Sequence, residues 1–62
     1  MKQDHVEAAR WYRKAADQGD AEAQFNLGCC FLNGEGVAQN PVESQRWYQK
    51  AAAQGFAQAK RE

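Results

Sequence analysis

Reactive side chains are few in this chain of 62 residues: one histidine, His5, and two adjacent cysteines, Cys29 and Cys30. A nucleophilic cysteine needs a base or a helix N-terminus to lower the pKa of its thiol. Both cysteines fall late in a predicted helix and His5 lies in the first turn of another, so we predict no catalytic residue. A closed zinc site needs three or four converging ligands. Two neighbouring thiols and one distant imidazole do not supply them, and we expect neither a metal nor a cofactor.

A glycine-rich segment, Gly34-Glu35-Gly36-Val37, shares only its composition with phosphate-binding loops. It lacks the Gly-Lys-Ser/Thr ending of such loops, and it follows a predicted helix where a phosphate loop follows a strand. Its two glycines supply the positive φ angles that a tight connection needs. The segment is therefore predicted to join two helices.

Composition argues against several classes of function. Eight basic residues balance eight acidic ones, so no basic surface predicts binding to nucleic acid or to an anionic membrane. The longest cluster of large apolar residues, 29–32, is too short to cross a membrane, and the first residues lack the pattern of a secretory signal. Adjacent cysteines close no loop, which predicts reduced thiols. We expect a small, soluble, helical protein, cytoplasmic by default, with a secreted or periplasmic protein whose leader has been removed as the alternative.

The chain repeats itself at an offset of 36 residues. Trp11-Tyr12 aligns with Trp47-Tyr48, and thirteen of the 21 positions over residues 3–23 are identical to their counterparts without a gap. Self-similarity at a fixed period is the signature of stacked structural repeats. We therefore interpret the chain as a short tandem array.

Helix-starting and helix-ending residues divide this array into helical segments. Asp4, Asp20 and Asn40 are residue types that cap helix N-termini, Pro41 suits the first helical position, and glycines after the Ala-rich stretches suit the left-handed position that ends a helix. The predicted helices cover residues 5–18, 21–32 and 41–54, with a short stub at 57–62. The predicted fold class is all-α, built from antiparallel helix pairs.

Helical spacing identifies the side chains that pack between these helices. Residues at i, i+4 and i+7 form one stripe on each helix. A glycine in mid-helix costs about 1 kcal/mol against alanine, so Gly28 indicates that another helix leans on it. The residues predicted to pack between repeats are Trp11, Tyr12, Leu27, Gly28, Phe31, Trp47 and Tyr48. For the two tryptophans, contact with a partner is the alternative.

Three motifs together resemble the Sel-one-like (Sel1-like) repeat family, a relative of the tetratricopeptide repeat. They are Ala-x-Ala-Gln-x-x-Leu-Gly at 21–28, Gly-x-Gly-Val at 34–37, and Trp-Tyr-x-Lys-Ala-Ala-x-Gln-Gly at 47–55 and again at 11–19. The resemblance covers essentially the whole chain. It implies right-handed superhelical stacking of α/α pairs, with residues 1–62 forming one repeat unit flanked by two half-repeats, and it implies use as a scaffold for protein–protein interaction.

The resemblance also indicates a binding surface. In tetratricopeptide-like stacks the first helix of each pair lines the concave groove, and here that is the helix at 21–32. The side chains of this helix that leave the packed stripe are Glu22, Phe25, Asn26, Cys29 and Asn33. Phe25 and Cys29, four residues apart, form an apolar strip beside amide groups suited to a peptide backbone. Packing of Phe25 within the protein is the alternative.

Two further functions stay open beside the first interpretation, which is a non-catalytic module that binds a protein or peptide of unknown identity. Apolar residues at the ends of the stack, including Val6, Trp11 and Phe56, predict self-association into a homo-oligomer or a helix-swapped dimer. Some relatives of the family bind or hydrolyse β-lactams, but no residue of this sequence carries that activity over.

Overall fold

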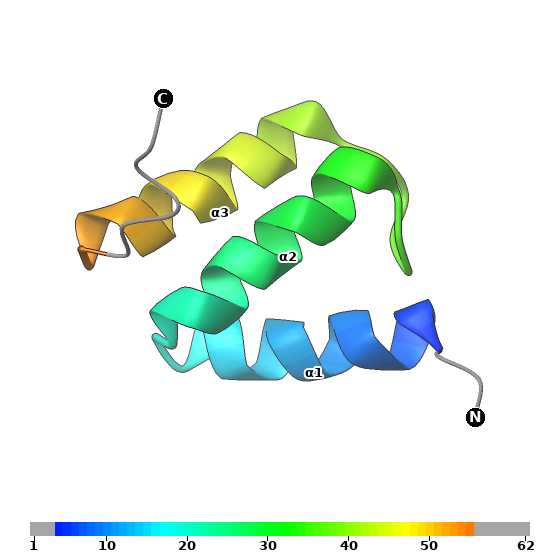
Figure 1. Cartoon of the computed structure of the whole chain (residues 1–62), viewed down its shortest axis with the longest axis horizontal. Helices are drawn as coiled ribbons and strands as arrows, with labels where there is room; N and C mark the ends of the chain where they lie inside the picture. Colours follow the sequence, from blue (N-terminus) through cyan, green and yellow to red (C-terminus); the bar gives the residue numbers. More distant parts are fainter. Residues whose placement is uncertain (1–3, 56–62) are drawn as a thin grey trace.

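The computed structural model describes residues 4–55, which form three α-helices and contain no strand (Figure 1). Helix α1 spans His5–Asp17, α2 spans Ala21–Asn33 and α3 spans Pro41–Ala53. Each helix begins at the predicted residue and ends within one residue of the predicted end. The stub predicted at 57–62 lies outside the described residues. None of the three helices is both long and apolar enough to span a membrane.

Each helix begins at a side chain that caps its first turn. Oδ1 of Asp4, Asp20 and Asn40 accepts a hydrogen bond from a backbone N–H of the following turn, at 3.1 Å in all three cases. These bonds satisfy donors that have no partner inside the helix. Helix α2 ends where Gly34 adopts a left-handed conformation with φ +71°. Local sequence signals therefore determine the helix boundaries.

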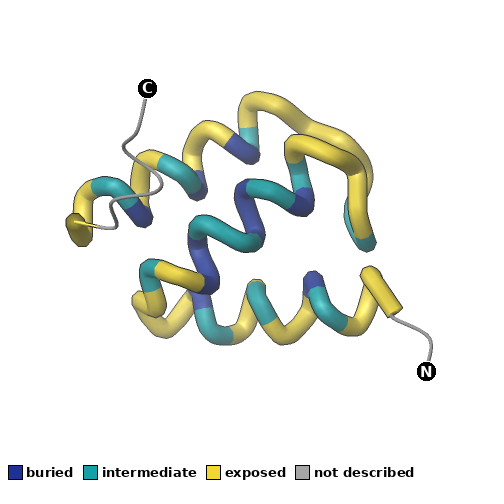
Figure 2. The backbone as a smooth tube through the Cα atoms, in the orientation of Figure 1, coloured by how far each residue is buried: buried dark blue, intermediate teal, exposed yellow. Residues whose placement is uncertain are grey.

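Helix α2 lies between α1 and α3, and the core follows its two sides (Figures 1 and 2). A buried cluster joins Ala16 of α1, Ala23 and Leu27 of α2, and Trp47 of α3. Leu27 is only 1% exposed. Alanines from α1 and α2 face larger side chains, which lets the helix axes approach closely.

A buried glutamine links the three helices at one end. Nε2 of Gln24 donates to the carbonyl oxygen of Ala16 at 3.1 Å, and Oε1 of Gln24 accepts from Nε2 of Gln54 at 2.9 Å. Gln24 is only 5% exposed, and burial of an amide is costly unless its polar atoms are hydrogen-bonded. Because both ends of this amide have partners, the link holds the C-terminal turns of α1 and α3 against α2.

The connection between α2 and α3 extends back to the first turn of α1 (Figure 1). Gly36 has φ +76°, and a Cβ at this position would overlap the carbonyl oxygen of His5. Val37 lines a small cavity together with Val6 of α1 and Leu27 of α2. The glycine-rich segment is thus a helix-to-helix connection, and it also packs one repeat unit against the helix of the preceding unit.

Candidate functional site

One side of α2 carries all five residues predicted to bind a partner. We call this surface the α2 face and define it by Glu22, Phe25, Asn26, Cys29, Leu32 and Asn33. Phe25, Asn26 and Cys29 are half-buried, while Glu22, Leu32 and Asn33 are exposed. Leu32 is not among the five residues predicted from the sequence. It lies seven residues after Phe25, a spacing that returns to the same side of a helix, and its side chain is 45% exposed.

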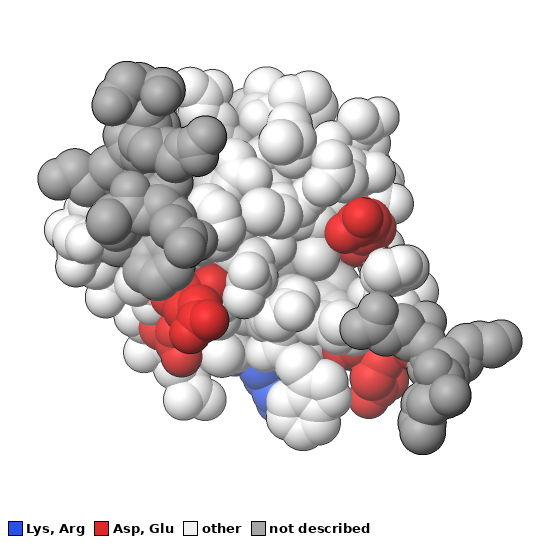
Figure 3. Space-filling view, viewed as in Figure 1, with Lys and Arg blue, Asp and Glu red and all other residues white. Residues whose placement is uncertain are grey.

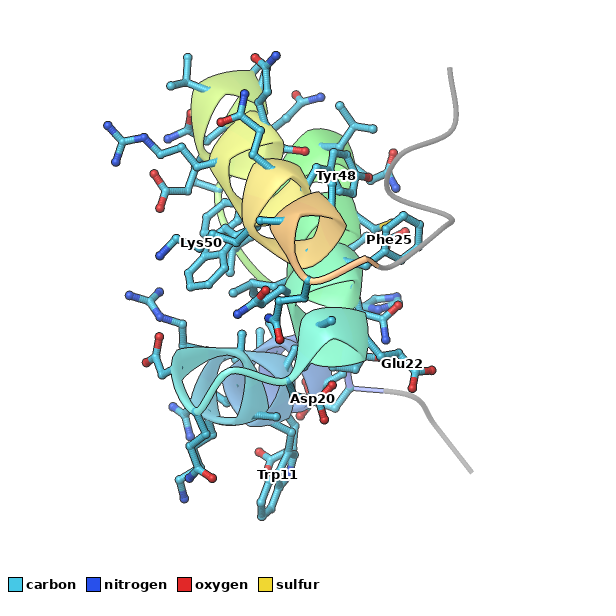
Figure 4. All side chains as sticks on the ribbon, turned by 90° about the vertical axis from the view of Figure 1, so that its left-hand side faces the viewer. Trp11, Asp20, Glu22, Phe25, Tyr48 and Lys50 are labelled. Carbon is cyan, nitrogen blue, oxygen red and sulfur yellow. The ribbon has the colours of Figure 1, made fainter. Side chains whose placement is uncertain are left out.

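Tyr48 of α3 extends the α2 face. Its ring lies against that of Phe25, with centroids 5.3 Å apart and an interplanar angle of 36°. Its hydroxyl donates a hydrogen bond to Sγ of Cys29 at 3.2 Å. Phe25 therefore packs within the protein, and the residue as a whole is half-buried. Figure 4 shows Glu22 and Phe25 pointing to the same side of the molecule, opposite to Lys50.

Gly28 allows Tyr48 to lie against α2. A Cβ on Gly28 would lie 2.7 Å from ring atoms Cδ1 and Cε1 of Tyr48 and 3.2 Å from the carbonyl oxygen of Ser44. Both distances are shorter than ordinary van der Waals contact, so any side chain at Gly28 would displace α3 or the tyrosine ring. The ring of Tyr48, and through it Phe25, is positioned by this close helix contact.

The polar groups near this face are poorly suited to nucleophilic chemistry. Burial, helped by the hydrogen bond to Cys29, raises the pKa of Tyr48 to about 12. Burial, and then the charge of Glu35, raises the pKa of the Cys30 thiol above its usual value. Ser44, the one serine in the sequence, is 1% exposed, so its hydroxyl is not available for acylation by a β-lactam. Over residues 4–55, no three His, Cys, Asp or Glu side chains gather as a metal site.

Basic side chains of the described residues are confined to two of the three helices. All the Lys and Arg residues within 4–55 belong to α1 and α3, whereas α2 and its flanking turns carry only acids: Asp20, Glu22 and Glu35. The side seen in Figure 3 is largely uncharged, with acidic groups around it and a small basic area at its lower edge. A partner that docks over α2 therefore meets an uncharged surface with an acidic border.

The two tryptophans at equivalent repeat positions lie in different environments. Trp47 is 6% exposed and packs against α1 and α2, whereas Trp11 is 61% exposed and points away from α2 and α3 (Figure 4). The cover of Trp47 comes from the helices before it in the chain. No such helix pair precedes α1 within the described residues, so inter-repeat packing of Trp11 stays a prediction.

A groove of about 390 Å³ lies between α1 and α2 beside Trp11. We call it the Trp11 groove; its lining residues are Trp11, Tyr12, Ala15, Asp20, Glu22, Ala23 and Asn26. Glu22 and Asn26 belong also to the α2 face, so the two surfaces are continuous. Of the five predicted partner-binding residues, the structure thus places these two beside the groove, Phe25 and Cys29 beside Tyr48, and Asn33 at the C-terminus of α2.

Comparison with known proteins gives a consistent assignment. The family model for the Sel1 repeat matches residues 1–20 and 21–56, and the boundary between these matches falls between α1 and α2. The structure is similar to the crystal structure of a Sel1 repeat protein from Oxalobacter formigenes, with a TM-score of 0.91 and 47% sequence identity over 95% of this chain and 24% of that one. The chain therefore spans about a quarter of that protein's length. A search of the curated proteins finds no match.

Sel1 repeats generally mediate protein–protein interaction and are typically non-catalytic. The 36-residue period, the three antiparallel helices and both matches agree. This chain belongs to the Sel1 repeat family.

Proposed function

We propose that this chain is a non-catalytic interaction module that binds a partner polypeptide on the α2 face. The observation that carries the proposal is the half-buried ring of Phe25, which is held by Tyr48 and lies on the same side of α2 as exposed Leu32. Membership of a family that generally mediates protein–protein interaction supports it.

Ordering this surface on binding costs little conformational entropy. Binding energy at protein interfaces concentrates in a few well-packed side chains, often aromatic, while the surrounding contacts exclude water. Phe25 is already restrained by its contact with Tyr48, so immobilising its side chain adds little to the free-energy cost of binding. Asn26 and Asn33 provide amide donors and acceptors for a peptide backbone.

The proposal is tested by selecting binders for the purified chain from a random peptide library and measuring their affinity by titration calorimetry. Leu32→Ala, at an exposed position that needs no repacking, is expected to weaken binding about five- to tenfold, as for a residue worth more than about 1 kcal/mol at an interface. Val42→Ala is the matched control, because Val42 is 67% exposed and lies on α3 outside the α2 face.

Phe25→Ala is the stronger variant, and circular dichroism must show that it keeps the helical content of the native chain. We expect it to abolish measurable binding of the selected peptides. Peptides that bind the native chain, Leu32→Ala and Phe25→Ala equally well would show that another surface is used, and a library that yields no binder would contradict the proposed function.

A further inference from the structure

We propose that Asn33 is a site of spontaneous deamidation, in which the backbone nitrogen of Gly34 attacks Cγ of the Asn33 side chain. A bond forms between these two atoms, the bond from Cγ to Nδ2 breaks, and Nδ2 leaves as ammonia with the proton that the Gly34 N–H gives up. Water then opens the resulting succinimide ring and leaves aspartate or isoaspartate. Three observations support this chemistry: the residue that follows Asn33, the exposure of its side chain and the hydrogen bonds that end α2.

The residue after an asparagine determines how easily its backbone nitrogen reaches the side-chain amide. Asn26, Asn33 and Asn40 are followed by leucine, glycine and proline respectively. Glycine has no Cβ to obstruct the attack, whereas leucine is bulky and the ring nitrogen of proline carries no hydrogen to give up. Asparagine is among the thermolabile residues of proteins, and the sequence favours reaction at Asn33.

The side chain of Asn33 is also the most accessible of the three. Asn33 is exposed at the end of α2, and over residues 4–55 its amide makes no hydrogen bond. Asn40, by contrast, uses Oδ1 to cap α3, and Asn26 is half-buried in the middle of α2. The amide of Asn33 is therefore free to turn toward the backbone of the next residue.

The end of α2 controls the attacking nitrogen. The N–H of Gly34 donates to the carbonyl oxygen of Cys30, and the N–H of Glu35 donates to the same oxygen at 2.9 Å. While Gly34 makes this bond its nitrogen does not attack, so the reaction requires the last turn of α2 to open. Terminal turns open at a much lower free-energy cost than global unfolding. Deamidation of Asn33 therefore proceeds from the folded chain, at a rate set by the opening of this turn.

One side chain of the connection to α3 holds the same turn closed. Nε2 of Gln39 donates to the carbonyl oxygen of Leu32 at 2.9 Å, and this bond is exposed. It satisfies one of the carbonyl groups that have no partner within the helix. Loss of this bond is expected to raise the fraction of molecules in which the turn is open, and with it the rate of deamidation.

Deamidation changes the charge at this end of α2. A carboxylate at position 33 is negative at the C-terminus of a helix, where the helix dipole and the unpaired carbonyl groups disfavour it. Glu35 already places one negative charge two residues further along. Because Asn33 belongs to the α2 face, the reaction also turns an amide of that face into a carboxylate. The modified chain is expected to be less stable than the native one.

The experiment incubates the purified chain at neutral and at alkaline pH and locates deamidated residues by tandem mass spectrometry of its proteolytic fragments. Asn33 is expected to react at least about tenfold faster than Asn26, since a difference of about 1.4 kcal/mol in opening free energy gives this ratio. The rate should rise with pH, because the deprotonated backbone nitrogen is the nucleophile. Asn33→Gln, which keeps an amide but lengthens the side chain, should remove the reaction at this position.

Variants test the role of the last turn and the effect of the product. Gln39→Ala is expected to speed deamidation of Asn33 about two- to tenfold, the effect of losing one hydrogen bond. Gln49→Ala, an exposed position on α3, is the matched control and should leave the rate unchanged. Asn33→Asp imitates one product, and its thermal unfolding midpoint should lie about 2–6 °C below that of Asn33→Gln.

Three results would overturn the proposal. Equal rates at Asn33 and Asn26 would show that the exposed end of α2 has no special reactivity. A reaction at Asn33 that appears only in urea, in proportion to the unfolded fraction measured by circular dichroism, would show that the folded chain is protected. An unmodified Asn33 in the native chain, under conditions in which an unstructured peptide of residues 30–36 is deamidated, would show that the last turn does not open.

Discussion

Replacement of Trp47 by alanine is expected to destabilise the chain strongly, while the same replacement of Trp11 is expected to have little effect. Trp47 is 6% exposed and Trp11 is 61% exposed. An aromatic side chain buries about 150–250 Å², so this difference in exposure is on the order of 120 Å² of apolar surface. At about 25 cal/mol per Å² that area corresponds to about 3 kcal/mol, and the cavity left by Trp47 raises the expected loss to about 3–5 kcal/mol.

The assay is urea unfolding followed by circular dichroism, with both alanine variants measured beside the native chain. For Trp11→Ala we expect a change within about 1 kcal/mol, because an exposed side chain and one exposed cation–π contact with Lys14 are lost. A chain this small has little stability to lose, so the measurements should be repeated in an osmolyte such as trimethylamine N-oxide, which strengthens apolar burial.

A phenylalanine variant at Trp47 keeps the loss of stability within measurable range. The Nε1–H group of Trp47 is buried and has no acceptor within the described residues. Trp47→Phe therefore removes an unpaired donor as well as apolar area, and its cost should be clearly smaller than that of Trp47→Ala. Equal losses for Trp11→Ala and Trp47→Ala would refute the reasoning, because they would require Trp11 to be covered in solution as Trp47 is covered by α1 and α2.

The remaining predictions concern helix contacts and pH. Gly28→Ala gains about 1 kcal/mol of helix propensity, but its Cβ would lie 2.7 Å from the ring of Tyr48. We therefore expect a net loss of about 1–2 kcal/mol in urea unfolding, and an unchanged or more stable variant would contradict the close helix contact. In Gly36→Ala, the alanine must adopt a left-handed φ and its Cβ overlaps the carbonyl oxygen of His5. In Gly19→Ala, at φ +97° with no atom within 4 Å of the new Cβ, the loss of stability is only the backbone cost of about 1–2 kcal/mol. Thermal unfolding should rank Gly36→Ala as clearly less stable, and equal midpoints would show that the loop does not pack on α1. The pKa of Tyr48 is raised from 10.0 to about 12, so the folded chain keeps a proton that the unfolded chain loses. The free energy of unfolding that this retained proton contributes is intact below pH 10 and is lost as the pH rises to about 12. It amounts to at most about 2.7 kcal/mol, less after solvent screening. The unfolding free energy of Tyr48→Phe should fall less steeply than that of the native chain between pH 10 and 12, and parallel curves would contradict the assignment.

The amino-acid sequence by itself determined the helices, their order and the family. Helix starts depend on caps such as Asp4 and Asn40, and helix ends depend on glycines such as Gly34, whose effects reach only a few residues along the chain. The 36-residue period is likewise visible without coordinates. Gly28 indicated that a helix leans on α2, because a mid-helix glycine is otherwise unfavourable. These features depend on residue types and their spacing along the chain, so they can be identified without coordinates.

The tertiary structure alone decided the environment of each exposed or half-buried side chain. Two tryptophans in identical local motifs differ in exposure because other helices cover one of them. Phe25 packs on Tyr48 and is half-buried, which helical spacing could not predict, since the position of α3 over α2 sets the contact. The contact of Gly36 with the first turn of α1 joins residues distant in sequence. Burial depends on which elements meet in space, and a periodic sequence assigns equivalent positions the same local structure whether or not a neighbour is present to cover them.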